Sequence, residues 1–186
     1  MVYDLRCIYK GNEPSFALET KVRNVSNNIN RSLIGNILKS IRVEKNIPMK
    51  KIASALKVSE STVSQIETGK NSATKEKINE ICHVCGCSFD YKTDRKKMID
   101  LVLYIYTQYS NLSTDEMNST IEEVKNNSFI SCSYARFEYY LILYMDGIIN
   151  QNNEDVQLFK RILEIGEYST HSEPHRPALR ATYSII

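Results

Sequence analysis

The segment 49–69 constrains the fold of this 186-residue chain more than any other part of the sequence. Apolar residues recur there at helical spacing in two groups on either side of a turn, namely Ile52, Ala53 and Leu56 and then Val63 and Ile66. Two short helices joined so tightly must cross at close range, which requires a small residue near the contact, and Ala53 supplies it. The segment therefore predicts two helices of about eight residues that pack against each other.

Start and stop signals bracket these two helices and predict two more. Pro48 suits the first turn of the first helix, where its missing N–H is harmless. Ser59 is a favoured N-cap for the second helix, and Gly69 is placed to end it. We expect a preceding helix that ends near Asn46 and a following helix from Thr74 to Gly86. The apolar face of the preceding helix consists of Ile34, Ile37, Leu38 and Ile41.

The rest of the chain divides into an N-terminal extension and a helical C-terminal part. Alternating apolar residues on either side of a turn predict a short β-hairpin within 1–23. Beyond residue 90 we expect antiparallel, repeat-like helix pairs at an interval of about 38–40 residues, over 92–110, 114–126, 132–150 and 154–168. A capping-box pattern at 113–116 marks the start of the second of these helices. The fold class is therefore mainly α, with domains at 1–30, 31–90 and 91–186.

Charge is distributed unevenly along the chain. Residues 1–90 carry 14 Lys and Arg against 9 Asp and Glu, a balance of +5, whereas residues 91–186 carry 10 against 13, a balance of −3. A basic front half favours contact with a polyanion. The longest apolar runs are too short to span a bilayer, and the first residues lack the pattern of a signal peptide. We therefore expect a cytoplasmic protein that does not enter a membrane.

The second helix of the segment 49–69 has a polar face. Its exposed positions are predicted to carry short or medium polar side chains, which are Glu60, Ser61, Thr62, Ser64 and Gln65. Such a face can enter a major groove and hydrogen-bond base edges without obstruction by apolar side chains. This pattern favours double-stranded DNA as the partner.

Several spaced motifs occur together between residues 34 and 90, which is some 30% of the chain. They are Ile34-Gly35, Arg42, the pair Ala53 and Leu56, Val58-Ser59, the run 66–70 (Ile-Glu-Thr-Gly-Lys) and the run 86–90 (Gly-Cys-Ser-Phe-Asp). Together they resemble the Xre-like, phage-repressor family of helix-turn-helix domains. The resemblance implies a five-helix bundle whose recognition helix spans 59–68. It also implies an ion pair between Arg42 and Glu67 that locks the first helix to the third.

The resemblance further implies roles for individual residues. The positions that contact bases are Glu60, Ser61, Thr62 and Gln65, of which Gln65 suits adenine and Glu60 suits the amino group of cytosine. The candidates for contacts with phosphates are Lys50, Lys51, Lys57, Ser64, Lys70 and Asn71. A homodimer is expected, because one module buries too little DNA for tight binding and a two-fold protein matches two half-sites.

The chain departs from the family pattern at two positions. Met49 stands where the family usually carries a Gln that contacts phosphate, so one anchoring hydrogen bond is expected to be absent. Lys57 stands in the turn where the family often has Gly. If the backbone there keeps a positive φ, a lysine costs roughly 1 kcal/mol relative to glycine.

The cysteines resemble a metal site in spacing but not in position. Cys82 and Cys85 have a CxxC spacing, and Cys87 follows two residues later. In the family these positions hold core residues, and free cysteine behaves as a small hydrophobe. His83 is expected on the other side of the helix, which leaves no fourth ligand. We therefore expect no metal site.

No pattern in the sequence supports catalysis. His171 and His175 lie in a polar loop with no nucleophile nearby, so we expect them to be solvated. There is no glycine-rich phosphate loop, nucleophile elbow or zinc-protease motif. We therefore expect neither a cofactor nor enzymatic activity.

The order of parts, a DNA reader followed by helix pairs, also resembles the peptide-responsive regulators of the Rgg and PlcR-like group. This resemblance implies that the C-terminal helices 91–186 dimerise and bind a signalling peptide or a protein partner. The favoured interpretation of the chain is a sequence-specific transcriptional regulator, such as a repressor. The alternative is a protein–protein adaptor whose C-terminal domain binds a partner or peptide and whose bundle no longer reads DNA.

Overall fold

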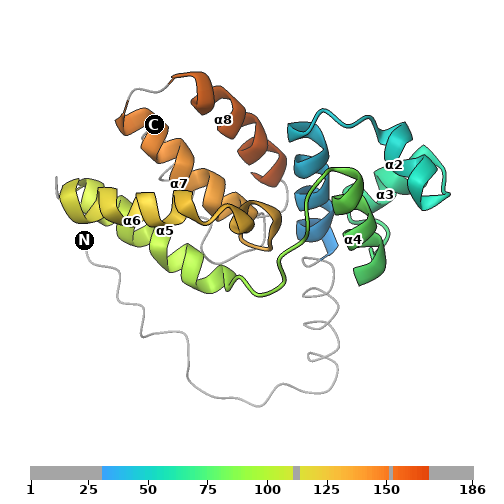
Figure 1. The fold of residues 1–186 in the computed structure, drawn as a ribbon, viewed down its shortest axis with the longest axis horizontal. Helices are drawn as coiled ribbons and strands as arrows, with labels where there is room; N and C mark the ends of the chain where they lie inside the picture. Colours follow the sequence, from blue (N-terminus) through green and yellow to red (C-terminus); the bar gives the residue numbers. More distant parts are fainter. Residues whose placement is uncertain (1–30, 111–113, 151–152, 168–186) are drawn as a thin grey trace, which may run out of the picture.

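The computed structural model describes residues 31–110, 114–150 and 153–167. This part of the chain is mainly helical, as the sequence predicted, and its helices form two groups (Figure 1). The first group comprises residues 31–44, α2 (Met49–Leu56), α3 (Glu60–Glu67) and α4 (Lys75–Val84). The second comprises α5 (Arg95–Ser110), α6 (Thr114–Asn126), a 3-10 turn η1 (Ser128–Cys132), α7 (Arg136–Ile149) and α8 (Asn153–Glu167). The hairpin predicted within 1–23 and the capping box at 113–116 lie outside the described residues and side chains.

The predicted caps set the ends of the helices in the first group. The Ser59 Oγ accepts a hydrogen bond from the Thr62 N–H at 3.1 Å, and the Thr74 Oγ1 accepts one from the Lys77 N–H at 3.4 Å. Gly69 and Gly86 have φ angles of +70° and +76°, a region that glycine adopts without steric cost. These helices therefore start and end at the residues that the sequence indicated.

One expectation for the first group is wrong. Residues 31–92 contain four helices rather than the five that the resemblance implied, because the chain from residue 86 to residue 94 runs without helix. The Cys87 N–H bonds to the Cys82 carbonyl at 2.9 Å, and the Asp90 N–H bonds to the Cys132 carbonyl. Phe89 is buried between these anchors. The next helix, α5, starts after Asp94 and packs on α6 and α7 instead.

The predicted helix 132–150 begins later than expected. Ser133 is extended, with φ −134° and ψ −179°, and it forms a single bridge with Asp90. Its Oγ donates to the Ile130 carbonyl at 2.8 Å and accepts from the Ala135 N–H at 3.0 Å. These local hydrogen bonds compete with helix formation, so η1 and α7 are separate elements. The remaining helices of the second group match their predicted ranges to within three residues.

A single hydrophobic core connects the two groups. Residues 31–44 contribute Leu33, Ile37, Leu38 and Ile41 to it, and α7 contributes the largest share of the second group. In α7, Phe137, Tyr139, Tyr140 and Tyr144 are all buried. Most of the described aromatic residues of the C-terminal part therefore serve helix packing rather than an exposed surface.

The junction between the groups also contains a buried polar network. Arg136 of α7 is 1% exposed and donates from Nε to the Ser40 Oγ at 2.6 Å. Its guanidinium also forms an ion pair with Glu44, and the Tyr140 hydroxyl donates to the same carboxylate at 2.9 Å. Ser40 and Glu44 lie one turn apart on the helix 31–44. This network fixes that helix against α7.

Candidate nucleic-acid interface

The turn between α2 and α3 has the tight geometry that the sequence predicted. Lys57 adopts φ +53° and ψ +43°, which is the left-handed conformation. Its N–H bonds to the Ser54 carbonyl at 3.3 Å, and the Val58 N–H bonds to the Ala53 carbonyl at 3.0 Å. Ala53 itself is buried where the two helices meet. The turn thus sends α3 across α2 at close range.

A buried ion pair holds α3 against the helix 31–44. The Arg42 Nε lies 2.6 Å from the Glu67 Oε1, and the Arg42 Nη2 lies 2.8 Å from the Glu67 Oε2. The side chains are 13% and 4% exposed. The hydrogen bond that Arg42 donates to Glu67 outweighs burial and raises the pKa of Arg42 above its usual value. This two-pronged contact fixes the rotation of α3 about its own axis.

Glycine allows the two helices to approach each other further. A Cβ at Gly35 would lie 2.4 Å from the Ile66 carbonyl oxygen and 2.8 Å from that of Glu67. Any other residue would push the C-terminal end of α3 outward. The close approach aligns α3 with its apolar residues Val63 and Ile66 in the core and its opposite face outward.

The outward face of α3 carries the residues that the sequence assigned to base contacts. Glu60, Ser61 and Gln65 are exposed, and Thr62 is half-buried beside the N-cap. The Thr62 hydroxyl is 2.9 Å from the Ser59 hydroxyl, so the cap restrains its rotation. The helix α3 that carries these residues lies at one edge of the molecule, away from α5–α8 (Figure 1).

Basic and polar residues surround this face. The side chains of Lys50, Lys51, Lys57, Lys70 and Asn71 are exposed, and Ser64 is half-buried. Met49, at the position where the family usually carries a Gln, is half-buried and packs against the hydrophobic core. Asn71 differs from the other residues in this set, because its side-chain amide bonds to Gln65 at 2.7 Å.

The comparison with protein families identifies this part of the chain. Residues 38–92 match the family model described as helix-turn-helix. These residues are a helix-turn-helix domain. No curated protein and no solved structure gives a significant match to the chain. The helix-turn-helix domain indicates a DNA-binding regulator of that type, and the resemblance of the C-terminal helices to the Rgg and PlcR-like group stays a prediction.

The cysteines of the helix-turn-helix domain belong to its core. Cys82 and Cys85 are buried, and Cys87 is half-buried beside Cys132 of η1. A hydrogen bond with Cys132 acts to lower the pKa of Cys87, but a hydrogen bond with Cys82 and burial outweigh it and raise that pKa to about 12. The Cys87 thiol is therefore protonated at neutral pH and is a weak nucleophile. Among the described residues, no three His, Cys, Asp or Glu side chains are placed to hold a metal ion.

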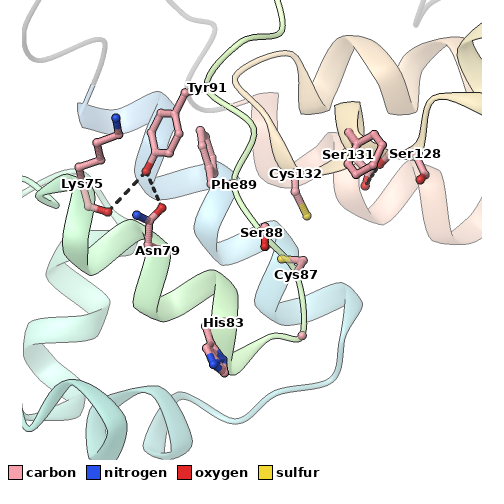
Figure 2. A pocket seen from close by; sticks show the side chains of 12 residues that line it. Lys75, Asn79, His83, Cys87, Ser88, Phe89, Tyr91, Ser128, Ser131 and Cys132 are labelled. Atoms are coloured by element: carbon pink, nitrogen blue, oxygen red, sulfur yellow. Dashed lines mark hydrogen bonds between the residues drawn. The ribbon is translucent and has the colours of Figure 1, made fainter.

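A second feature lies at the junction of the helix-turn-helix domain with η1. Residues of α4, of the connection 86–91 and of η1 line a cavity of about 1060 Å³. Figure 2 shows the side chains that line it. Phe129 lines it and is 75% exposed, and the hydroxyl of Tyr91, which also lines it, donates to the Asn79 Oδ1 at 2.9 Å. Most of the residues that line the cavity belong to the helix-turn-helix domain, whereas the sequence predicted a partner on the C-terminal helices.

Sequence reasoning did not find the contacts that join distant segments. Arg136 and Glu44 are 92 residues apart, and Arg95 pairs with Glu138 across 43 residues at 2.7 Å. Charged residues on amphipathic helices usually face solvent, so nothing local marks Arg136 and Glu138 as buried or Glu44 and Arg95 as half-buried. The hydrogen bond between Gln65 and Asn71 was also missed. The one feature of the local sequence that points to this hydrogen bond is Gly69, because it ends α3 and reverses the direction of the chain before Asn71.

No described helix is both long enough and apolar enough to cross a membrane.

Proposed function

We propose that the protein is a sequence-specific transcriptional regulator that inserts α3 into the major groove of double-stranded DNA, as a homodimer. The observation that carries the proposal is the exposed polar face of α3, held at a fixed rotation by the Arg42–Glu67 pair within a helix-turn-helix domain. A rigid helix is needed because hydrogen bonds to base edges tolerate little change in position. The face also has no exposed apolar side chain that would obstruct the groove.

The proposed contacts follow from the exposed residues. Glu60, Ser61, Thr62 and Gln65 contact base edges from the face of α3. Phosphates are contacted by the residues around that face, which are Lys50, Lys51, Lys57, Ser64, Lys70 and Asn71. Base contacts supply specificity, whereas phosphate contacts supply position and salt-dependent affinity.

Selection from a randomised duplex pool tests the proposal. Bound duplexes are sequenced, and the affinity of the protein for the enriched site is measured by fluorescence anisotropy at two salt concentrations. We expect a palindromic site, which the double variant Ser61→Ala with Gln65→Ala no longer enriches. Weak binding that depends strongly on salt and enriches no site would contradict the proposal.

The controls use matched substitutions far from α3. Ser119→Ala combined with Gln157→Ala removes the same two side-chain types from exposed positions on α6 and α8. This variant should enrich the same site as the unmodified protein. Thermal unfolding of both double variants checks that the folds are intact.

The homodimer requires a test of its own. Size-exclusion chromatography with light scattering gives the mass of the free protein and of its complex with the enriched duplex. Two chains on each palindromic duplex are expected, because two-fold symmetry pairs one recognition helix with each half-site. One chain per duplex would leave the DNA-binding proposal intact and remove the dimer.

The alternative function is a protein–protein adaptor, which the exposed Phe129 beside the cavity favours. Charge reversal of Lys50 and Lys70 separates the two functions. A DNA-binding regulator should lose affinity for every duplex, whereas Lys160→Glu on α8 should leave binding unchanged. An adaptor would keep its protein partner in the Lys50→Glu and Lys70→Glu variant, because its bundle does not read DNA.

A further inference from the structure

Asn71 makes two hydrogen bonds with Gln65 of the recognition helix. Its backbone N–H donates to the Gln65 carbonyl oxygen at 3.0 Å. Its side-chain Nδ2 donates to the Gln65 Oε1 at 2.7 Å. The same residue thus holds both the backbone and the side chain of Gln65, although it lies beyond the end of α3.

The fold places Asn71 there through the turn that ends α3. Gly69 has φ +70°, and its N–H bonds to the Ile66 carbonyl at 3.0 Å. A Cβ at Gly69 would lie 2.7 Å from the Cα of Ser32, so the helix 31–44 presses directly on this turn. The left-handed residue reverses the chain and returns Asn71 over the last turn of α3. Asn71 therefore has a fixed position relative to Gln65.

The orientation of the Gln65 amide decides which base it can recognise. An amide edge presents one acceptor, Oε1, and one donor, the Nε2–H. Adenine presents the complementary pair, because its N6 amino group donates and its N7 accepts. Guanine presents two acceptors, O6 and N7, so an amide held in this orientation would place Oε1 against the guanine O6. A freely rotating Gln65 could instead turn its amino group toward guanine.

We propose that Asn71 is a positioning residue for base specificity, which fixes the Gln65 amide so that α3 selects adenine over guanine at one position of each half-site. The inference rests on the proposed function. The Gln65 Oε1 has two lone pairs, so it can accept from Asn71 and from the adenine N6 amino group at once. Asn71 thereby acts on DNA through Gln65, in addition to any contact with phosphate.

The two roles of Asn71 have different consequences. A phosphate contact contributes equally to all duplexes, so its loss lowers affinity without changing the preferred base. A positioning residue changes the preference at one base pair. The preference of the protein for adenine over guanine at that position is therefore the quantity to measure.

The experiment repeats the duplex selection with full-length Asn71→Ala and Asn71→Asp. The first removes the donor to Gln65, and the second replaces it with a carboxylate that attracts the Gln65 Nε2 and so turns the amide around. Both keep the backbone hydrogen bond. Because a good two-point contact discriminates between bases by about 5- to 150-fold, we expect each variant to lose at least about fivefold of the adenine preference at one position. The other selected positions should stay unchanged.

Two controls make the outcome decisive. Ser72→Asp adds the same charge as Asn71→Asp at the next exposed position without removing the donor, so it should keep the adenine preference. In a Gln65→Ala background, Asn71→Ala should have no further effect on base preference. Uniform loss of affinity with an unchanged adenine preference would overturn the positioning role and leave the proposed function standing. Absence of any enriched site with the unmodified protein would overturn the proposed function itself.

Discussion

At the scale of single residues, the Arg42–Glu67 pair shows how one contact orients the polar face of α3. Both side chains are largely withdrawn from solvent, and their hydrogen bonds join the first and third helices of the bundle. Removing one partner of such a pair leaves the other charge buried without a counter-charge. The resulting loss of folding stability is larger than the net stability that the intact pair contributes. The pair therefore matters both for stability and for the rotation of α3.

We expect Glu67→Gln to lower the free energy of unfolding by about 3 kcal/mol, because Arg42 keeps its charge and loses its carboxylate. Denaturant unfolding followed by circular dichroism measures the change. Glu122→Gln is the matched control, since the Glu122–Lys125 pair on α6 is exposed, and its loss should cost less than about 1 kcal/mol. Equal effects of the two substitutions would contradict the assigned role of the buried pair.

Lys57 allows a prediction in which stability and binding change in opposite directions. Its φ of +53° is strained for a residue with a Cβ, so Lys57→Gly should raise the free energy of unfolding by about 1 kcal/mol. The same substitution removes a proposed phosphate contact and should weaken binding to all duplexes. Denaturant unfolding and anisotropy measure the two effects. Lys51→Gly, within α2, is the control and should lower stability by about 1 kcal/mol instead.

Most of this residue-level detail followed from the sequence, because caps and turns are local. Ser59, Gly69 and Gly86 have the roles that their types and spacing indicated. The Gln65–Asn71 hydrogen bond did not follow from the sequence, because it depends on how the helix 31–44 fixes the turn at Gly69.

At the scale of elements, the contact between the helix 31–44 and α7 decides how the DNA-binding domain is attached. Glu44, Arg136 and Tyr140 form its polar part, and the arginine also lies over the Tyr140 ring at 4.6 Å. Burial acts to raise the pKa of Glu44, but the charge of Arg136 and its hydrogen bonds outweigh burial and lower that pKa. The contact should therefore respond to acid.

The sign of that response follows from the lowered pKa. A carboxylate that titrates lower in the folded protein stabilises the fold above its unfolded pKa of about 4.3, and this contribution is lost as the pH falls through the folded pKa. We expect Glu44→Gln to lower stability at pH 7 by roughly 3 kcal/mol and to flatten the dependence of stability on pH below about 4.3. Denaturant unfolding between pH 7 and pH 3 measures both effects. Glu80→Gln, an exposed control on α4, should keep the slope of the unmodified protein.

Element boundaries were predictable where local signals set them and less so where distant contacts did. The ranges of α2, α3 and α4 agree with their caps. The missing fifth helix of the bundle and the late start of α7 have a common cause. The Asp90 N–H bonds to the Cys132 carbonyl, which holds two segments of the chain extended side by side.

At the scale of the whole molecule, the two helix groups share one core. Phe89 and Tyr91 from the connection contact Tyr134, which precedes α7, with ring centroids 5.1 and 6.2 Å apart. The core and the Arg136 network join the two groups, so we expect the segments on either side of residue 90 to fold together, and the domain division at that residue stays a prediction from the sequence. Two independently stable domains would instead each have a hydrophobic core of their own.

We therefore expect the chain to unfold in a single cooperative transition. Circular dichroism at 222 nm reports all helices, whereas tyrosine fluorescence reports mainly α5–α8 and the connection, because the chain has no tryptophan. The two signals should give coincident denaturant curves. Two separate transitions would show instead that residues 31–90 and 91–186 fold independently, and Arg136→Met should move the protein toward that behaviour.

The sequence by itself determined the helices, their caps and the polar face of α3, because these depend on periodicity and on residues within one or two turns of each other. It also indicated which face of the bundle we propose to contact DNA, since the motif that carries that face is contiguous. The tertiary structure alone decided which charged residues are buried, how the helix 31–44 is fixed to α7, and that Asn71 returns to Gln65. Those contacts depend on segments that meet only when the core forms, and no local pattern encodes their meeting.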